Sequence, residues 1–144
     1  MTAETAETAW AHLPNAKHID AVLADARKRP EAWTTARGAA GVTAWDAAWA
    51  AAGDAVRGAV LDAAWDAART AAWDAAQRAA RDAAWGAVRD AVWGAIRAII
   101  AWDSAADLLD CTPDVLRTMI DLAEPPVCHQ AALLLPYAIV RFGQ

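Results

Sequence analysis

Residues 33 to 100 repeat every four positions and read, in groups of four, WTTA RGAA GVTA WDAA WAAA GDAV RGAV LDAA WDAA RTAA WDAA QRAA RDAA WGAV RDAV WGAI RAII. The first column is mostly Trp or Arg, the second mostly Asp or Gly, and the last two are mostly Ala. Alanine is the strongest helix former and is depleted in strands, and no proline interrupts the array. The array therefore predicts an all-α protein, built from long alanine-rich helices packed as a bundle or an oligomeric assembly.

A period of four residues does not match the turn of an α-helix. Each group of four ends about 40° beyond the previous one, so the Trp/Arg column winds around a straight helix. Because a neighbouring helix covers only one stripe, two arrangements remain. Either the array breaks into shorter helices, or partner chains cover one long helix from several sides. If it breaks, we expect the break between Gly53 and Gly58, since each glycine costs ~1 kcal/mol relative to alanine.

A continuous helix would spread its tryptophans over different sectors. Trp65 and Trp73 would lie on one side, and Trp85 and Trp93 on another. Such a helix would extend about 100 Å at ~1.5 Å per residue, which the short flanking segments cannot cover. Under that condition we predict a homo-oligomer of symmetric form, in which partner chains cover the exposed indoles.

The first column also places Trp and Arg four residues apart, where helical side chains touch. A guanidinium on an indole face contributes roughly 0.5–1 kcal/mol per exposed contact. One interpretation is a solvated surface on which aspartates and arginines neutralise each other. The other is a partner-recognition stripe, because Trp and Arg are favoured at interface hot spots. The candidate interaction residues of this stripe are Trp65, Arg69, Trp73, Trp85, Arg89, Trp93 and Arg97.

Segments of more ordinary composition flank the array and give three regions of one domain, namely residues 1–32, 33–102 and 103–144. In the first region, we expect Asn15 to cap a short helix over residues 16–28 with its aliphatic residues on one face. The acidic stretch before this helix is expected to be frayed. The last region is predicted to form a small helical cap on the array.

Two helix starts are predicted in the last region. Ser104 and Asp107 have the spacing of a capping box, with Asp in the place of Glu. Thr112 followed by Pro113 is typical of a cap with proline at the first helical position. A further helix is expected over residues 127–141. These helices carry much of the conventional aliphatic core material of the chain.

The residues that could carry chemistry have no productive spacing. No Cys-x-x-Cys or His-x-x-x-His pair is present, which disfavours a metal site. The only serine, Ser104, is better explained as a helix cap, and nothing in the spacing recommends a Cys/His nucleophilic pair. We therefore expect no enzyme activity, no catalytic residues, no metal and no cofactor. The candidates considered are Cys111, Cys128, His12, His18 and His129.

Charge and hydropathy exclude other classes. The net charge is −5, and the array holds equal numbers of Asp and Arg, so it neither attracts nor imitates nucleic acid. The longest apolar run, residues 131–140, is far shorter than the ~20 residues of a membrane span. The polar, acidic start is unlike a signal peptide, and two cysteines make no disulfide framework. We therefore expect a reduced, cytoplasmic protein.

Three pieces of the chain carry a resemblance: LPNAKHID at 13–20, the array itself, and LLD at 108–110 with PD at 113–114 and LLLP at 133–136. Together they resemble the alanine- and tryptophan-rich proteins of actinobacteria and their phages, which carry DAAW and DAAR tetrapeptide arrays without an assigned function. The resemblance implies no activity and supplies no catalytic residues.

Two functions from different classes follow. The first is a non-enzymatic structural or interaction protein that self-associates through its Ala/Trp helix surfaces. The second is a small phage or accessory regulator that binds and inhibits a host protein through the acidic C-terminal region. An enzyme with a Cys/His site ranks third.

Overall fold

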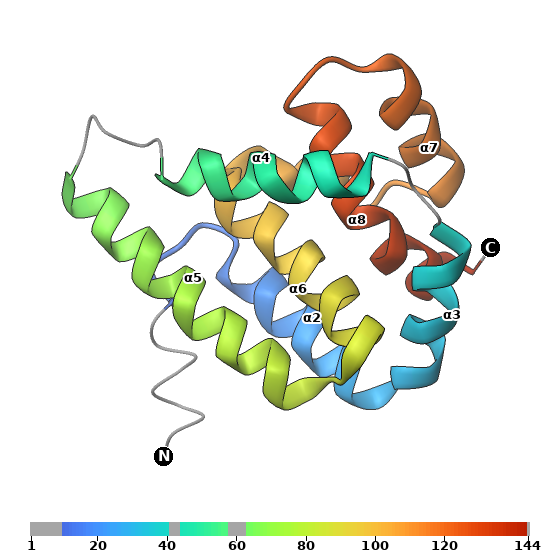
Figure 1. The fold of residues 1–144 in the computed structure, drawn as a ribbon, viewed down its shortest axis with the longest axis horizontal. Coiled ribbons are helices and arrows are strands. Elements are labelled where there is room, and N and C mark those ends of the chain that lie inside the picture. Colours follow the sequence, from blue (N-terminus) through green and yellow to red (C-terminus); the bar gives the residue numbers. More distant parts are fainter. Residues whose placement is uncertain (1–9, 41–43, 58–62, 144) are drawn as a thin grey trace.

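The computed structural model describes residues 10–40, 44–57 and 63–143, and this part of the chain is all-helical, as the array predicts (Figure 1). The helices pack into one compact arrangement in which elements distant in sequence touch each other. In chain order they are α2 (Ala16–Lys28), α3 (Pro30–Ala40), α4 (Trp45–Arg57), α5 (Ala63–Ala83), α6 (Gly86–Ala101), the 3-10 helix η1 (Asp103–Leu108), α7 (Pro113–Leu122) and α8 (Val127–Phe142).

Helix α2 has the predicted bounds, but Asn15 acts differently from the prediction. Its side chain makes no capping hydrogen bond to α2. Instead, its Nδ2 donates to the carbonyls of Ile99, at 3.5 Å, and Asp103, at 3.0 Å. Carbonyls at a helix end lack partners within the helix, so Asn15 satisfies the end of α6 and ties α2 to it. The predicted apolar face is confirmed, with Ile19, Val22, Leu23 and Ala26 all buried.

The chain just before α2 is packed rather than frayed where it is described. Trp10 is 1% exposed, and its indole N–H donates to the Asp20 carboxylate at 2.9 Å. Trp33 of α3 is also fully buried and donates to Asp25 at 2.8 Å. Two acidic side chains of α2 therefore each hold a buried indole, an arrangement that satisfies the indole donors while their rings fill the core.

The four-residue array is divided among α3, α4, α5 and α6, which is the first of the two expected arrangements (Figure 1). Helix α4 continues through Gly53 and ends at Arg57, while Gly58, the other end of the expected break, lies outside the described residues. A further division, between α5 and α6, was not predicted. Each helix can thus bury its own stripe.

The corner between α5 and α6 is tight. Helix α5 ends at Ala83 and α6 begins at Gly86, with Trp85 in an extended conformation between them. Gly86 has a φ of 53°, in the left-handed region that glycine adopts at little cost. The second of the two expected arrangements, one continuous helix, is therefore wrong. The homo-oligomer was predicted only for a continuous helix, so any self-association would have to use other exposed surfaces.

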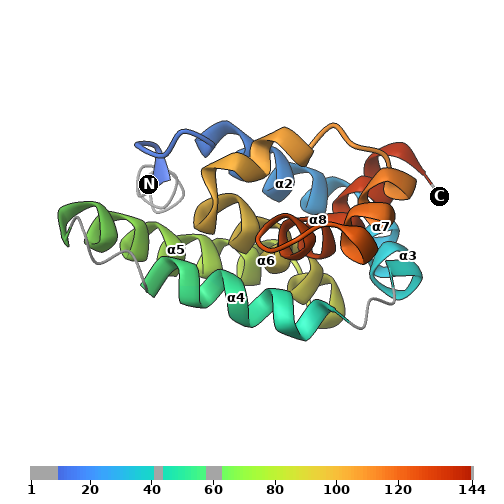
Figure 2. The ribbon, with the colours of Figure 1, turned by 90° about the horizontal axis from the view of Figure 1, so that it is seen from above.

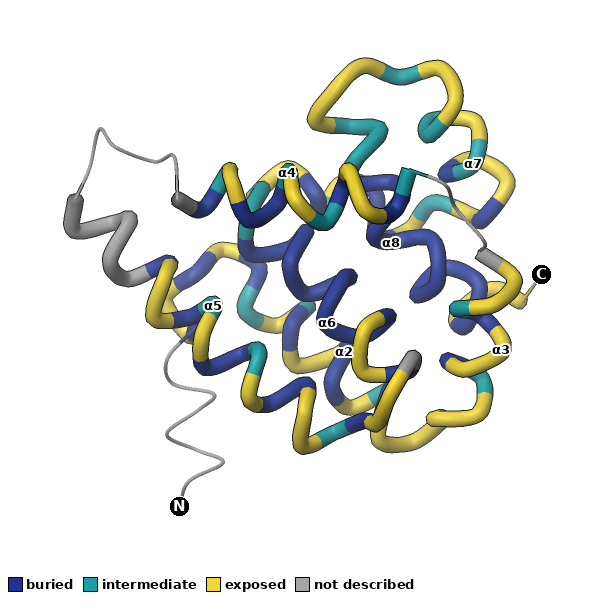
Figure 3. Tube along the Cα trace, in the orientation of Figure 1, coloured by how far each residue is buried: buried dark blue, intermediate teal, exposed yellow. Residues whose placement is uncertain are grey.

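Helices α6 and α8 form the centre of the fold. Figure 2 shows α2 on one side of this pair and α4 on the other. Every residue from Ala91 to Ile100 is buried, as is every residue from Ala131 to Val140 (Figure 3). These two segments are covered on every side, so the least alanine-rich part of the array and the last helix supply most of the core.

Glycine permits a close approach at the centre. Gly94 of α6 faces the indole of Trp45 at the start of α4, and a Cβ added at Gly94 would lie 2.6 Å from two ring atoms. Trp45 is itself buried, so its ring has little room to move. The glycine therefore sets how closely α4 lies against α6.

The C-terminal region confirms one predicted helix start and overturns the other. Thr112 caps α7, with its hydroxyl accepting from the Val115 N–H at 3.5 Å and a proline following it. The capping box at Ser104 is wrong, because η1 already includes this residue. The Ser104 hydroxyl instead accepts from Nε2 of the buried Gln130 in α8 at 3.1 Å. Its role is to satisfy a core amide.

Candidate interaction surfaces

The predicted Trp/Arg stripe is divided between the interior and the surface. Arg69, Trp93 and Arg97 are buried, and Trp73 is half-buried. Trp85 is 89% exposed, and Arg89 is exposed with it. The side chain of Trp65 lies outside the described part of the chain. Residues with equal spacing in sequence thus have opposite environments.

The buried group is built around Arg97 of α6. Its guanidinium carbon lies 4.2 Å from the ring centroid of Trp49, 4.5 Å from Trp73 and 5.7 Å from Trp93. Its Nη2 donates to the carbonyl of Trp49. Trp73 and Trp93 meet edge to face at 4.9 Å. Because these residues come from α4, α5 and α6, the cluster joins three helices of one chain by cation–π and ring contacts.

Arg69 of α5 has a comparable internal role. It is 5% exposed, and its Nη1 donates to the carbonyl of Ile100 near the end of α6. Its Nη2 lies 3.3 Å from the Asp103 carboxylate. A cation at a helix C-terminus is favoured by the free carbonyls and the helix dipole. Arg69 therefore fixes α5 against the end of α6.

Replacing Arg97 by lysine tests the importance of the planar guanidinium. Arg97→Lys keeps the charge but loses the flat surface between the indoles, so the free energy of unfolding should fall by about 1–2 kcal/mol. Urea denaturation followed by tryptophan fluorescence measures this change. Arg89→Lys is the matched control, since Arg89 is exposed on the same helix and should change stability by less than about 0.5 kcal/mol. Equal effects would contradict the internal role of Arg97.

The exposed group lies at the corner of α5 and α6. Arg81 and Arg89, four residues before and after Trp85, are also exposed. These two arginines share a small pocket of about 250 Å³ with the indoles of Trp49 and Trp93. Trp85 itself does not line the pocket, and it presents its indole to solvent. Of the predicted stripe, Trp85 and Arg89 are the described residues available to a partner.

A second exposed apolar surface lies on α7, which sequence reasoning did not single out. Val115 is 43% exposed, Leu122 is 80% exposed, and Met119 between them is half-buried. Their spacing of four and three residues places them on one side of the helix. Leu116, three residues before Met119, is buried on the adjoining side of the helix, and α7 packs on α8 at the edge of the molecule (Figure 3). We call Val115, Met119 and Leu122 the α7 face.

Acidic side chains flank the α7 face along one side and beyond the end of the helix. Asp114 belongs to the first turn of α7, Asp121 to its last turn, and Glu124 follows the helix; all three are exposed. The single basic residue of α7, Arg117, lies 3.8 Å from Asp114. The face therefore combines apolar and negatively charged groups.

The chemistry-bearing residues do not converge on one another. Cys111 and Cys128 are free thiols, each half-buried. Within the described residues, no group of three or more His, Cys, Asp or Glu side chains is arranged to hold a metal ion. Burial, followed by the neighbouring Lys17, lowers the pKa of His18, against an opposing effect of Asp110.

Tyr137 of α8 is the only tyrosine of the chain, and its ring is packed between other side chains. Its ring stacks on Trp33, with centroids 5.6 Å apart and planes at 17°, and the Arg141 guanidinium carbon lies 5.3 Å from its centroid. Burial is the largest cause that raises the pKa of Tyr137, while Arg141 opposes it. The phenol therefore holds its proton more tightly in the folded protein.

This raised pKa predicts a loss of stability in alkali. Because the unfolded chain releases the phenolic proton first, the contribution of Tyr137 is fully present below about pH 10 and is lost as the pH rises through its folded-state pKa. Absorbance at alkaline pH, where tryptophan does not ionise, should report a single late phenol transition. Tyr137→Phe should remove this part of the alkaline destabilisation. A phenol that ionises at its ordinary pKa in the folded protein would overturn the expectation.

Along the described helices, none combines the length and the apolar character needed to cross a membrane. Comparison with protein-family models, with curated proteins and with solved structures gives no match. The resemblance to tetrapeptide-repeat proteins accordingly stays a prediction.

Proposed function

We propose that this protein is a non-enzymatic interaction protein that binds a basic partner protein through the α7 face. The observation that supports this proposal is an exposed apolar stripe, flanked by carboxylates, on a helix that packs on α8 along an adjoining side. Apolar residues at such spacings are how one helix docks into a groove of another protein. In this role the chain would be a small accessory or phage regulator of a host protein.

Charge favours a different protein over a second copy of this chain as the occupant of the α7 face. Two α7 faces in contact would bring Asp114, Asp121 and Glu124 of both copies together, which is unfavourable. A groove with an apolar floor and a lysine- or arginine-rich rim would instead match both features. The C-terminal region adds further exposed carboxylates at Asp107 and Asp110, which extend the attraction for a basic partner.

The size of the apolar stripe sets the strength of such a complex. Fully burying an exposed valine or leucine side chain contributes roughly 1.5–3 kcal/mol each. Val115 and Leu122 are only partly exposed, and association itself costs several kcal/mol, so these two residues alone support a weak complex. Charge complementarity would mainly speed the encounter and make it sensitive to salt.

A synthetic probe tests the α7 face without knowledge of the natural partner. The probe is a fluorescent amphipathic helix of leucines and lysines, and binding is followed by anisotropy. The protein should bind this peptide, and Val115→Ser with Leu122→Ser should weaken binding by about tenfold or more. High salt should also weaken it.

Two controls make the result specific. Trp85→Ser removes an exposed apolar side chain elsewhere and should leave peptide binding unchanged. A peptide with glutamates in place of the lysines should bind much more weakly. Equal binding of both peptides, or wild-type affinity in the double serine variant, would show that the α7 face does not carry this function.

Self-association is the second candidate, and the exposure of Trp85 is the observation that favours it. An indole that is 89% exposed at the corner between two helices is the residue type found at interface hot spots, and its burial in a second copy would remove it from water. Light scattering should then report a larger species at high micromolar concentration, and Trp85→Ala should restore the monomer mass. A wild-type protein that stays monomeric would reject this candidate.

A further inference from the structure

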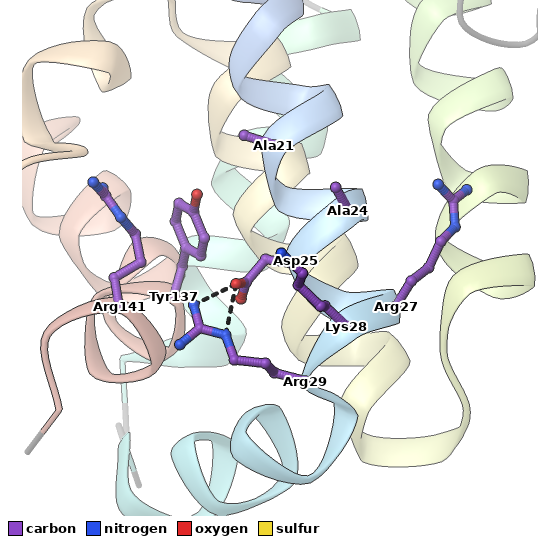
Figure 4. A pocket seen from close by; sticks show the side chains of 8 residues that line it. All are labelled: Ala21, Ala24, Asp25, Arg27, Lys28, Arg29, Tyr137 and Arg141. Carbon is purple, nitrogen blue, oxygen red and sulfur yellow. Dashed lines mark hydrogen bonds and ion pairs between the residues drawn. The ribbon is translucent and has the colours of Figure 1, made fainter.

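A larger pocket, of about 590 Å³, opens between α2 and α8, and its volume is typical of sites for small molecules. Figure 4 shows its lining residues, which come from one helix near the start of the chain, the connection after it, and the last helix. The lining residues are Ala21, Ala24, Asp25, Arg27, Lys28, Arg29, Tyr137 and Arg141.

The pocket is basic although the chain is acidic. Its only carboxylate, Asp25, is already engaged: it accepts from Arg29 Nε at 2.8 Å and from the Trp33 indole N–H at 2.8 Å. Arg27 and Lys28 are exposed and have no ion pair within the described part of the chain. The pocket therefore keeps a local positive charge on a chain whose net charge is −5.

Arg141 and Tyr137 give the pocket directed donors. In Figure 4 the phenol oxygen of Tyr137 and the guanidinium of Arg141 extend to the same side of α8. Arg141 is held in place by donating Nη1 to the Leu109 carbonyl, with Nη2 3.4 Å from the exposed Asp110. Tyr137 is held by its stacking on Trp33. A fixed guanidinium beside a hydroxyl is suited to a carboxylate or phosphate group.

Part of the α2 side of the pocket is apolar. Ala21 and Ala24 contribute only methyl groups, and the ring of Tyr137 also lines the pocket. A fully hydrated inorganic ion would gain nothing from these groups. An organic ligand with an apolar body would displace water from them and so gain affinity.

We propose that this pocket binds a small organic anion, with its carboxylate or phosphate group on Arg141 and the Tyr137 hydroxyl and its apolar body against Ala21 and Ala24. Lys28 at the rim attracts the anion by its field, and Arg27, whose side chain extends to the opposite side of α2 in Figure 4, adds to this field from farther away. This ligand site is separate from the α7 face and does not depend on the protein interaction proposed above.

Phenyl phosphate is a suitable probe, because it combines both parts of the expected ligand. Titration calorimetry should show binding, with inorganic phosphate and phenol each at least tenfold weaker. Arg141→Gln should weaken phenyl phosphate binding by about tenfold or more, as expected for loss of a charge-assisted hydrogen bond. Arg27→Gln with Lys28→Gln, on exposed positions that leave the fold intact, should weaken it severalfold and reduce its salt dependence.

The controls separate a built site from general charge attraction. Arg78→Gln removes an exposed arginine of α5 outside the pocket and should leave binding unchanged. Bound phenyl phosphate should also shift the alkaline transition of Tyr137 to higher pH, because a nearby anion disfavours the phenolate. No binding at millimolar concentration, an affinity no better than that of inorganic phosphate, or an equal loss in Arg78→Gln would overturn the proposal.

Discussion

Trp93→Ala is expected to lower the free energy of unfolding by about 3–5 kcal/mol, the largest effect we foresee for one side chain. Trp93 is 4% exposed, meets Trp73 edge to face at 4.9 Å and lies beside the guanidinium of Arg97. Its removal would leave a cavity where α5 and α6 meet. Guanidinium denaturation monitored by far-UV circular dichroism measures the change.

Trp85→Ala provides a control of identical chemistry. Because Trp85 is 89% exposed, its truncation should change stability by less than about 0.5 kcal/mol. Trp93→Phe should lie between the two, since it keeps a ring and removes an indole N–H that is buried without a described hydrogen-bond partner. Similar losses for Trp85→Ala and Trp93→Ala would contradict the packing of α6.

Gly94→Ala is expected to destabilise the fold by about 1–3 kcal/mol through overpacking. Alanine normally stabilises a helix interior, but here its methyl would lie 2.6 Å from the Trp45 ring. Either α4 or the indole would have to move. Thermal and urea denaturation of the variant would report the loss.

Gly38→Ala should have the opposite sign. Gly38 lies in α3, is exposed, and has nothing within 4 Å of an added Cβ. The substitution should therefore stabilise the protein by about 0.5–1 kcal/mol through helix propensity alone. A stabilising Gly94→Ala would show that α4 does not lie against α6 as described.

The parts of the fold that could be predicted are those with ordinary amphipathic patterns. The bounds and buried face of α2, the Thr112 cap of α7 and the start of α8 at Val127 follow from local signals that act over one or two turns. The side-chain roles of Asn15 and Ser104 were wrong because their partners, in α6 and α8, are distant in sequence.

Burial within the array could not be predicted from local sequence, because nearly identical segments lie in different environments. WGAV at 85–88 and WGAI at 93–96 differ by one methylene group, yet Trp85 is exposed and Trp93 is buried. Gly86 turns the chain with a positive φ, whereas Gly94 stays helical against Trp45. Only tertiary packing decides between them. For the same reason the sequence did not show which arginines of the stripe are buried. The α7 face was missed because the apolar residues of α7 were all expected to belong to the core.

The similarity of the tetrads also affects how the helices of the array find one position relative to each other during folding. A slip of one tetrad would move a helix about 6 Å along its axis and turn it about 40°, and it would replace most side chains by similar ones. The alignment of the helices must therefore be enforced by the columns whose residue changes from one tetrad to the next, Trp or Arg in the first column and Asp or Gly in the second. The missing side chain at Gly94 leaves room for the indole of Trp45. Arg69 donates to the Ile100 carbonyl near the end of α6, a contact that a slip of one tetrad would break. A sequence of uniform DAAW units would retain helicity but lose these markers, so it should populate several interchangeable packings in place of one native state.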